Sequence, residues 1–410
     1  MIAFEKYVLD NGLRVILHQD ESSPMAVVNV AYDVGSRDEE VEKTGFAHLF
    51  EHLMFGGSAN IPDFDTPIQM AGGENNAFTN CDMTNFYNIL PAENIETALW
   101  LESDRMMKLD FSSKSLATQQ KVVIEEFKET CLNQPYGDMW HHLSDMAYKE
   151  HSYRWPTIGL VPEHIQDAKL GDVEAFFYRY YRPNNAVLVI AGNIQISDVK
   201  SQINKYFSDI PAGIELKRSL PVETKQSQFR SKIIEAAVPL PSIIMAFGMC
   251  NRLNDDYYAV DLLSDILANG RSSRFFVNIY KKSICSTIDA FISGTFDPGL
   301  FIVEARPMPG VSIDQTREVI WNELNEIKAK GVQSEELEKI RNKTESSLVY
   351  SEVSILHKAM NLAYYEILGD AEMINIQSQK YQNVTAEDIK RVANEILSQE
   401  QCNEIIYLPK

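Results

Sequence analysis

The sequence predicts an α+β fold made of two similar domains, each a mostly antiparallel sheet packed against long helices. Three observations lead to this prediction. The chain has 410 residues, which is too long for a single core at the usual domain size. Short β-branched apolar runs are separated by long stretches with helical periodicity. The order of these elements in the first half of the chain is repeated in the second half.

The chain begins with a predicted β-hairpin. In YVLDNGLRVILHQD, Asn11-Gly12 lies between two apolar runs, and this dipeptide in such a setting is a strong hairpin signal. The next apolar run, MAVVNVAYDVGS, predicts a further strand that ends at Gly35. Residues 44–55 then have helical character, and the two glycines that follow are suited to end a helix.

Strands and helices alternate through the rest of the first half. Residues 75–91, NNAFTNCDMTNFYNILP, predict two strands because they are rich in aromatic and β-branched residues. Two long helical stretches follow, NIETALWLESDRMMKL and SLATQQKVVIEEFKETCLN, and then a loop rich in proline and glycine. The half closes with the helix LGDVEAFFYRYY, the strand NAVLVIAGN and the helix ISDVKSQINKYFSDI.

A polar segment separates the two halves. Residues 211–230, PAGIELKRSLPVETKQSQFR, contain two prolines, many polar side chains and no hydrophobic periodicity. Such a composition is typical of an interdomain linker. We therefore expect an N-terminal domain over residues 1–212, a linker over residues 213–230 and a C-terminal domain over residues 231–410.

The second half repeats the order of the first. Two strands in SKIIEAAVPLPSIIMAFGM precede the helix DDYYAVDLLSDILANG, which takes the place of the helix at residues 44–55. Further strands, STIDAFISG and LFIVEARP, precede a series of long helices. Thr385 and Asp388 have the spacing of a capping box at the start of the last helix, which leads into the strand CNEIIYLP. The repeat is one of element order and not of sequence identity.

The bulk composition excludes several classes of partner. The net charge is −20, which argues against nucleic acid and anionic membranes. The charge serves solubility or an acidic chamber that attracts cationic peptides, and composition does not separate these two interpretations. No apolar run has the length of a membrane span, and the N-terminus does not have the pattern of a signal peptide, so we expect a cytoplasmic protein. The five cysteines are scattered without a CxxC, which indicates reduced thiols.

The segment GFAHLFEHLMFGG contains the most specific chemical pattern. His48 and His52 are four residues apart, so on a helix both imidazoles face the same side and can bind one metal ion. Glu51 lies beside them, where a carboxylate can act as general base toward water held by the ion. This order, H-x-x-E-H, is the inverted zincin pattern. The alternative is that the two histidines are packed or surface side chains that share a helix by chance.

A catalytic zinc site normally has a third protein ligand, and QQKVVIEEFKE supplies three candidate acids. These are Glu125, Glu126 and Glu129. We take Val122 and Val123 to mark the apolar side of this helix, and the positions three and four residues later point to Glu126. The alternative is a solvated charged helix face, which is the ordinary role of a glutamate-rich stretch.

Taken with its surroundings, HLFEH followed by the last glutamate of VVIEE resembles the pitrilysin/insulin-degrading enzyme family of zinc peptidases. The likeness is greatest to the short-chain branch that includes mitochondrial processing peptidase. It extends over essentially the whole chain, since LDNGLRVIL, VGSRDE, NAFT, YRWPTIG and NNAVLVIAGN also resemble family segments. The resemblance implies a zinc-dependent metalloendopeptidase that cleaves peptides or unfolded segments in an enclosed chamber, with this chain forming half of a clamshell.

The resemblance also implies roles for individual residues. One Zn²⁺ per chain would be held by His48, His52 and Glu126, and Glu51 would be the general base. The family's NAxT strand is an edge strand to which a peptide substrate adds by main-chain pairing. In this chain the matching residues are Asn76, Ala77, Phe78 and Thr79.

Two departures from the family pattern concern supporting residues. Many relatives carry a second glutamate seven residues before the third ligand, where this chain has Gln119. An amide there can form hydrogen bonds around the ligands but supplies no charge. The family also often carries an arginine and a tyrosine that bind the substrate carbonyl. After GRSSRFF this chain has no clear arginine, Ser286 or its neighbours stand where the tyrosine is expected, and Tyr280 is a possible substitute.

These departures lead to a prediction about assembly. The chain has two of the four domains of a complete clamshell, and some relatives divide the work between a zinc-bearing subunit and a zinc-less one. We therefore expect a homodimer, or a heterodimer with a homologous subunit that supplies the arginine and tyrosine. The alternative is a non-catalytic or weakly active scaffold subunit of the same family. The complete ligand set argues against this alternative, whereas Gln119 and the missing pair argue for it.

Overall fold

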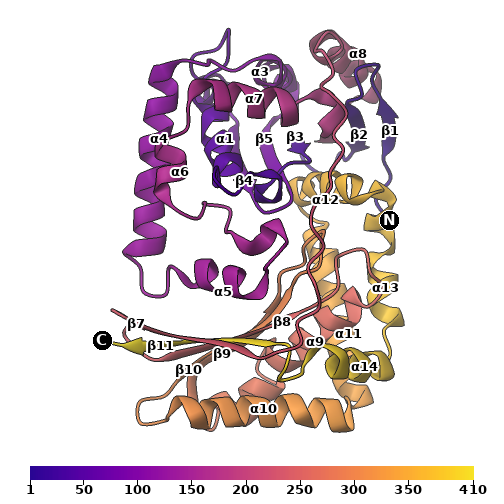
Figure 1. The fold of residues 1–410 in the computed structure, drawn as a ribbon. Coiled ribbons are helices and arrows are strands. Elements are labelled where there is room, and N and C mark those ends of the chain that lie inside the picture. The colour runs from indigo at the N-terminus through magenta and orange to yellow at the C-terminus, as the bar shows by residue number, and fades with distance from the viewer. The chain divides into compact units, whose positions relative to one another are not determined.

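The computed structural model describes residues 1–410, which form two compact units with one main sheet each (Figure 1). The predicted α+β fold with two sheet-and-helix domains is confirmed. Unit 1 contains residues 1–128, 155–220 and 349–376, and unit 2 contains residues 129–154, 221–348 and 377–410. No helix of either unit has the length and apolar character needed to cross a membrane.

Unit 1 contains a six-stranded sheet with the order β1-β2-β6-β3-β5-β4. Its strands are β1 (Glu5–Val8), β2 (Arg14–Gln19), β3 (Met25–Tyr32), β4 (Glu74–Thr79), β5 (Thr84–Pro91) and β6 (Ala186–Gly192). Only β2 and β6 pair in parallel. The predicted hairpin joins β1 to β2, and Gly12 in its turn has a φ of 86°, which suits glycine. The strand β4 is an edge of this sheet.

Unit 2 contains a five-stranded sheet with the order β7-β11-β8-β10-β9. Its strands are β7 (Arg230–Ala236), β8 (Ser242–Gly248), β9 (Cys285–Ile292), β10 (Leu300–Pro307) and β11 (Cys402–Pro409). Again only one pair, β7 with β11, is parallel. The order β7-β11-β8-β10-β9 has the same directions and connections as β2-β6-β3-β5-β4 of unit 1. The repeat of element order in the sequence is therefore a repeat of topology.

Most helices occupy the stretches with helical periodicity, but residues 139–147, where we expected a loop, also form a helix. Those of unit 1 are α1 (Phe46–Phe55), α2 (Asp65–Met70), α3 (Ile95–Met107), α4 (Ser113–Phe127), α6 (Pro162–Gln166), α7 (Leu170–Tyr180), α8 (Ile196–Phe207) and α12 (Ile355–Leu368). Those of unit 2 are α5 (Met139–Ala147), α9 (Tyr257–Ala268), α10 (Ile313–Lys330), α11 (Ser334–Ser351), α13 (Gln377–Asn383) and α14 (Ala386–Ile396). The capping box at Thr385 and Asp388 begins α14 as expected.

Each half of the chain contributes one helix to the unit that the other half mainly forms. The helix α5 comes from the first half and packs against β11 and β8 of unit 2. The helix α12 comes from the second half and packs against β6, β3 and β2 of unit 1. The expected domains at residues 1–212 and 231–410 therefore differ from the compact units by these two segments. The physical reason is that strands such as β3 and β6 are buried on both faces, so each sheet needs a second covering layer.

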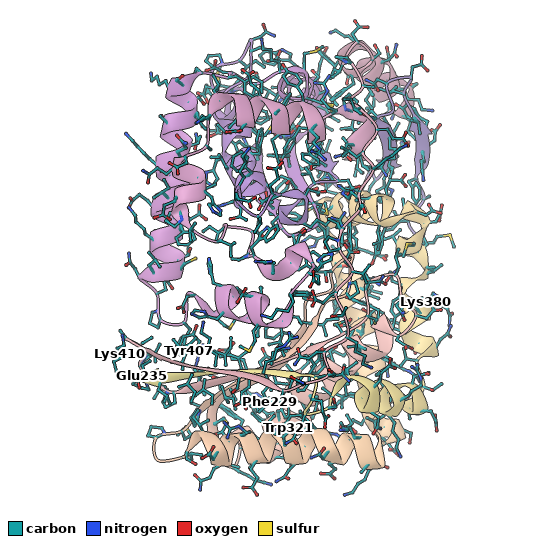
Figure 2. All side chains as sticks on the ribbon, in the orientation of Figure 1. Phe229, Glu235, Trp321, Lys380, Tyr407 and Lys410 are labelled. Carbon is teal, nitrogen blue, oxygen red and sulfur yellow. The ribbon has the colours of Figure 1, made fainter.

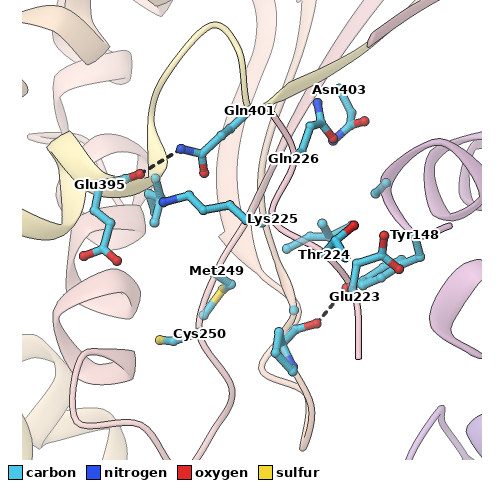
Figure 3. Close-up of a pocket in the computed structure, with 16 residues that line it drawn as sticks. Tyr148, Glu223, Thr224, Lys225, Gln226, Met249, Cys250, Glu395, Gln401 and Asn403 are labelled. Atoms are coloured by element: carbon cyan, nitrogen blue, oxygen red, sulfur yellow. Dashed lines mark hydrogen bonds between the residues drawn. The ribbon is translucent and has the colours of Figure 1, made fainter. Parts of the chain in front are cut away.

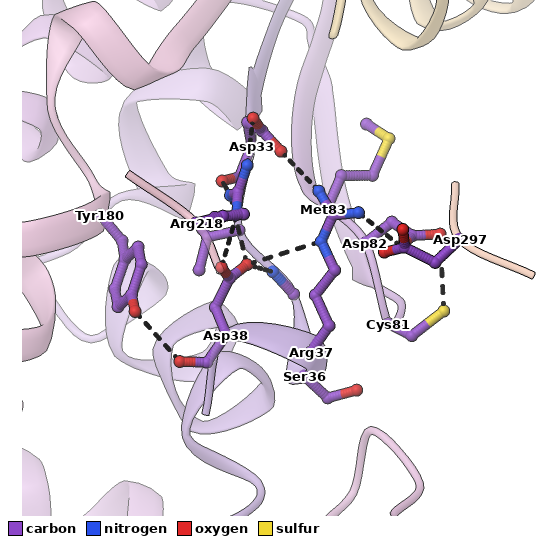
Figure 4. A network of polar contacts seen from close by, with 12 residues as sticks. Asp33, Ser36, Arg37, Asp38, Cys81, Asp82, Met83, Tyr180, Arg218 and Asp297 are labelled. Carbon is purple, nitrogen blue, oxygen red and sulfur yellow. Dashed lines mark hydrogen bonds and ion pairs between the residues drawn. The ribbon is translucent and has the colours of Figure 1, made fainter. Parts of the chain in front are cut away.

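The expected linker contains no helix or strand between Phe207 and Arg230, and the unit boundary falls at Leu220–Pro221. Within unit 1, Arg218 forms ion pairs of 2.6 Å with both Asp33 and Asp38 (Figure 4).

The other side of the linker is anchored within unit 2. The carboxylate of Glu223 accepts hydrogen bonds from the backbone N–H groups of Lys149, Glu150 and His151. Glu223 and the next three linker residues also line a cavity of about 270 Å³ at the ends of β8, β10 and β11 (Figure 3).

A further cavity of unit 2 lies beside the sheet edge formed by β7. It has a volume of about 470 Å³, and its lining includes Ile233. Phe229 and Trp321, which are labelled in Figure 2, also line it. Phe229 is 50% exposed and Ile233 is 63% exposed. This edge of unit 2 therefore exposes two large apolar side chains beside the charged residues of β7.

Candidate metal centre

The helix α1 has one face that is only partly buried, and the histidines lie on it. Its buried residues are Phe46, Ala47, Leu49, Phe50, Leu53 and Met54. Phe50 packs in a stacked arrangement on Phe176 and Tyr181, with ring centroids 5.1 and 5.0 Å away. This packing fixes the rotation of α1, so that His48, Glu51 and His52 are directed away from the core of unit 1. The i, i+3, i+4 spacing in the sequence thus produces one cluster of side chains, as expected.

The helix α4 brings the acid to this face. Ser112 caps its N-terminus by accepting a hydrogen bond from the Ser115 N–H, and Val123 is fully buried. Glu126 lies three residues after Val123 and so faces the same side. Our use of Val122 as a second marker was wrong, because its side chain is 45% exposed and the apolar side is marked by Val123 and its helical neighbours.

The other two candidate acids are directed elsewhere. Glu125 is 72% exposed and forms an ion pair of 2.7 Å with Lys128. Glu129 follows the end of α4, belongs to unit 2 and is exposed. Of the three acids, the structure brings only Glu126 to the histidines.

Three ligand atoms converge between α1 and α4. The Nε2 atoms of His48 and His52 are 3.3 Å apart. The carboxylate oxygens of Glu126 lie 3.7 Å from His48 Nε2 and 3.3 Å from His52 Nε2. No other group of three or more metal-binding side chains occurs in the chain. The residues at the corresponding helix of unit 2, α9, do not form such a group.

These separations fit a zinc ion. In a tetrahedral site with bonds of about 2.0–2.1 Å, neighbouring ligand atoms lie about 3.3 Å apart. Two imidazole nitrogens and one carboxylate oxygen are also the ligand types of catalytic zinc sites. The set leaves the fourth tetrahedral position without a protein ligand, as a catalytic site requires. The residues present therefore fit the metal that the sequence predicts.

The protonation states are also suited to metal binding. Burial lowers the pKa of His48 to about 4, so its imidazole is neutral at pH 7. A hydrogen bond with His52, together with the nearby imidazoles, lowers the pKa of Glu126 although partial burial opposes this. A neutral imidazole and an ionised carboxylate are the forms that coordinate metal ions, so binding need not first remove protons from these two groups.

Glu51 is held outside this ligand cluster by a hydrogen bond. Its Oε2 atom accepts the hydroxyl proton of Thr79 at 2.7 Å, and Thr79 is the last residue of β4. Burial raises the pKa of Glu51, and the Thr79 hydroxyl and His52 partly offset this rise. A carboxylate with a raised pKa beside a metal-binding cluster is suited to accept and return a proton. The Glu51–Thr79 hydrogen bond was not predicted from the sequence.

The strand of the predicted substrate-binding residues is the edge strand β4. It pairs with β5 on one side only, and it packs near α1. Asn76 is exposed, whereas Ala77, Phe78 and Thr79 are partly buried. The free edge of β4 therefore lies on the same unit as the metal-binding cluster and is joined to it through Thr79.

The start of α1 is held by residues that sequence reasoning missed. The buried Glu39 accepts hydrogen bonds from the backbone N–H groups of Gly45 and Ala47. His164 lies 2.8 Å from the Thr44 hydroxyl through its Nδ1 atom. Neither contact has a local sequence signal, because each depends on how the segment before α1 folds back. An acid a few residues before a predicted helix is the only hint.

The residues at which the chain departs from the family pattern lie in both units: Gln119 is in unit 1, and Tyr280 and Ser286 are in unit 2. Gln119 lies in α4 two turns before Glu126, and its Nε2 atom is close to Gly56 at the end of α1. The role of Gln119 in forming hydrogen bonds around the metal ligands stays a prediction. Tyr280 ends a short π-helix of unit 2, where its ring stacks on Phe276 at 5.1 Å. Ser286 is the second residue of β9 and donates a hydrogen bond to the Arg306 carbonyl.

Comparison with known proteins identifies the family. Residues 14–159 match the family model described as "Insulinase (Peptidase family M16)". Residues 167–344 match the model described as "Peptidase M16 inactive domain". The first range contains His48, Glu51, His52 and Glu126, and the second contains most of unit 2.

Individual relatives are similar over nearly the whole chain. The chain is 26% identical to "Zinc protease PqqE" of Helicobacter pylori, over 99% of this chain and 93% of that protein. It is 25% identical to "Probable mitochondrial-processing peptidase subunit beta, mitochondrial" of Arabidopsis thaliana, over 95% of this chain and 75% of that protein.

A solved structure is also similar to this chain over its full length. The crystal structure of a protease from Helicobacter pylori matches the structure with a TM-score of 0.95, 26% identity and full coverage of both chains. The predicted resemblance to this family of zinc peptidases is thereby confirmed, and the chain belongs to the M16 peptidase family.

Proposed function

We propose that this protein is a zinc-dependent metalloendopeptidase that cleaves peptides or unfolded polypeptide segments. The observation that carries the proposal is the convergence of His48, His52 and Glu126 at separations suited to tetrahedral zinc. Relatives named zinc proteases support the class of reaction. The family is one of zinc peptidases, and the activity of this member is the part that we propose.

Each residue of the cluster has a role in this proposal. His48 and His52 would hold one zinc ion through their Nε2 atoms, and Glu126 would hold it through its carboxylate. Bound there, zinc supplies Lewis acidity, which polarises a carbonyl group and makes water more acidic. Glu51 accepts a proton from the attacking water and later returns it to the leaving amine. The Thr79 hydroxyl holds Glu51 in position for both transfers.

The edge strand β4 is the proposed site for the substrate backbone. An extended peptide can pair with its free side, as peptides do with exposed sheet edges in other proteins. Asn76, Ala77, Phe78 and Thr79 would contact the peptide, with Thr79 also bonded to Glu51.

We propose that the active form is a dimer. The chain lacks a clear arginine and tyrosine to bind the substrate carbonyl, and one relative is named as a subunit of a processing peptidase. A zinc-less homologue would supply the missing groups, whereas in a homodimer the second copy would supply only a substitute such as Tyr280. The alternative is a weakly active scaffold subunit, and Gln119 together with the missing pair is the observation in its favour. The complete ligand cluster favours the enzyme.

The substitution Glu51→Gln tests the proposal. It keeps the shape of the side chain and the three ligands, but an amide cannot accept the proton. We expect zinc content to remain that of the wild type and peptide cleavage to fall by about 10²–10⁴-fold. Elemental analysis and hydrolysis of a quenched-fluorescence peptide library, with and without chelator, measure the two quantities.

His52→Ala provides the complementary variant, because it removes a ligand and should lose both zinc and activity. Normal cleavage by Glu51→Gln would rule out Glu51 as the base. Wild-type protein that binds no zinc and does not cleave peptides would favour the scaffold alternative. Cleavage that is unaffected by chelator would instead rule out the zinc dependence.

A further inference from the structure

The helix that carries the histidines begins without a capping side chain of its own. The N-cap residue of α1 is Gly45, which has a φ of 85° and no side chain to accept a hydrogen bond from the first turn. The backbone also leaves no space for one, because a Cβ atom at this position would lie 2.8 Å from the carbonyl oxygen of Ile158. Since the first N–H groups of a helix need partners, another residue must supply them.

Glu39 supplies these partners from outside the helix. Its Oε2 atom accepts the N–H of Gly45 at 2.9 Å, and its Oε1 atom accepts the N–H of Ala47 at 2.8 Å. The residue is only 7% exposed. Burial raises the pKa of Glu39 well above its usual range, and the hydrogen bonds from Ala47 and Gly45 oppose this rise. The two carboxyl oxygens therefore serve as hydrogen-bond acceptors for the start of the helix.

The segment around Glu39 is itself fixed by buried contacts. The preceding residue, Asp38, forms an ion pair with Arg218 at 2.6 Å (Figure 4). Arg37 forms an ion pair of 3.1 Å with Asp82. The indole N–H of Trp155 donates a hydrogen bond to the Ser36 carbonyl. Glu39 therefore extends from a rigid support, so its two hydrogen bonds define the position of the first turn of α1.

His48 follows Ala47 directly and lies in that first turn. A shift of the turn would move His48 relative to His52 and Glu126, whose ligand atoms are now 3.3–3.7 Å from its Nε2 atom. Metal sites tolerate displacements of only about 0.5 Å. We propose that Glu39 is a positioning residue for the metal centre, which aligns His48 by capping α1 in place of the side chain that Gly45 lacks. This inference rests on the proposed function.

The test compares Glu39 with its neighbour Glu40. Glu39→Gln keeps the shape of the side chain but directs an amide NH₂ toward a backbone N–H, so one hydrogen bond is lost. Glu40→Gln makes the same substitution one residue later, in a side chain that is 69% exposed. Three quantities are measured on full-length protein: the exchange rate of backbone amides 45–48 in zinc-free protein, the zinc dissociation constant by competition with a chelator, and the visible absorption spectrum of the cobalt-loaded form.

We expect Glu39→Gln to increase amide exchange at residues 45–48, to weaken zinc binding by about 10-fold or more, and to alter the cobalt spectrum. Glu40→Gln should leave all three unchanged. Folded Glu39→Gln protein with wild-type zinc affinity and cobalt spectrum would overturn the inference. If Glu39→Gln does not fold, Glu39→Asp retains a carboxyl group but withdraws it from the amides, and the same zinc and cobalt measurements decide. Wild-type protein that binds no zinc would instead overturn the proposed function.

Discussion

Glu125 and Glu126 are neighbours in sequence, yet the structure places them in different environments. Glu126 contacts both histidines, whereas Glu125 is 72% exposed and paired with Lys128. We expect Glu126→Gln to weaken zinc binding by at least about 10-fold, because a neutral amide is a poorer zinc ligand than a carboxylate. Glu125→Gln should bind zinc as the wild type does. Calorimetric titration of the two variants makes the comparison, and equal affinities would show that Glu126 is not a ligand.

At the scale of single residues, the sequence predicted the common face of the histidines and Glu51. It did not predict the side chains that hold them in place. The spacing of His48, Glu51 and His52 fixes their common face on any helix, so no structure was needed. Three acids are candidates for the third metal ligand, and spacing along one helix does not show which of them faces α1. The contacts from Thr79 to Glu51 and from Glu39 to Ala47 join residues that only the folded chain brings together.

At the scale of elements, two glycines of neighbouring helices have opposite requirements. Gly45 begins α1 with a φ of 85°, and a Cβ atom there would collide with the Ile158 carbonyl. Gly171 lies in the first turn of α7, where a Cβ atom would meet nothing within 4 Å. We expect Gly45→Ala to destabilise the fold by about 1–3 kcal/mol and Gly171→Ala to stabilise it by about 0.5–1 kcal/mol.

Urea denaturation followed by circular dichroism measures both changes. The expected result is a lower urea midpoint for Gly45→Ala and a higher one for Gly171→Ala, relative to the wild type. Equal midpoints for the two variants would mean that α1 can begin in another conformation. In that case the close approach of the Ile158 loop does not define the start of the helix.

Most elements were predictable because their periodicity is local. Strands and long helices appear where the sequence places them, in both halves of the chain. The helix α5 is the clearest omission, since we expected a loop there. Its apolar residues Leu143, Met146 and Ala147 have helical spacing and are buried. The prolines and glycines on either side of α5 obscured this signal, and a nine-residue helix gives few repeats of the pattern.

At the scale of the whole molecule, the exchange of α5 and α12 could not be predicted. Element order shows which helices exist but not which sheet each one covers. The helix α12 buries Ala359, Leu362 and Ala363 against the sheet of unit 1, although it lies in the second half of the chain. The domain boundaries expected at residues 212 and 231 describe the repeat in the sequence. The compact units also depend on packing between residues far apart in the chain.

At the scale of the whole molecule, we also predict that the chain needs a second subunit to reach its full activity. The ligand cluster and the base lie in one chain, but groups that would bind the substrate carbonyl are not evident in it. The loss of one such donor typically costs about 10²–10³ in rate, so an isolated monomer should cleave peptides slowly. If a second copy supplies the donors, the activity per chain should rise with protein concentration as dimers form. If a zinc-less homologue supplies them, activity should instead rise when that subunit is added.

Analytical ultracentrifugation and peptide hydrolysis over the same concentration range distinguish these two assemblies. A homodimer gives parallel curves of dimer fraction and of activity per chain. A heterodimer gives a slow enzyme at every concentration until the partner is present. Glu51→Gln is the matched control, because it should associate as the wild type does but remain inactive. A monomer that cleaves at full rate at the lowest concentration would show that this chain carries its own oxyanion donors, with Tyr280 the first residue to substitute.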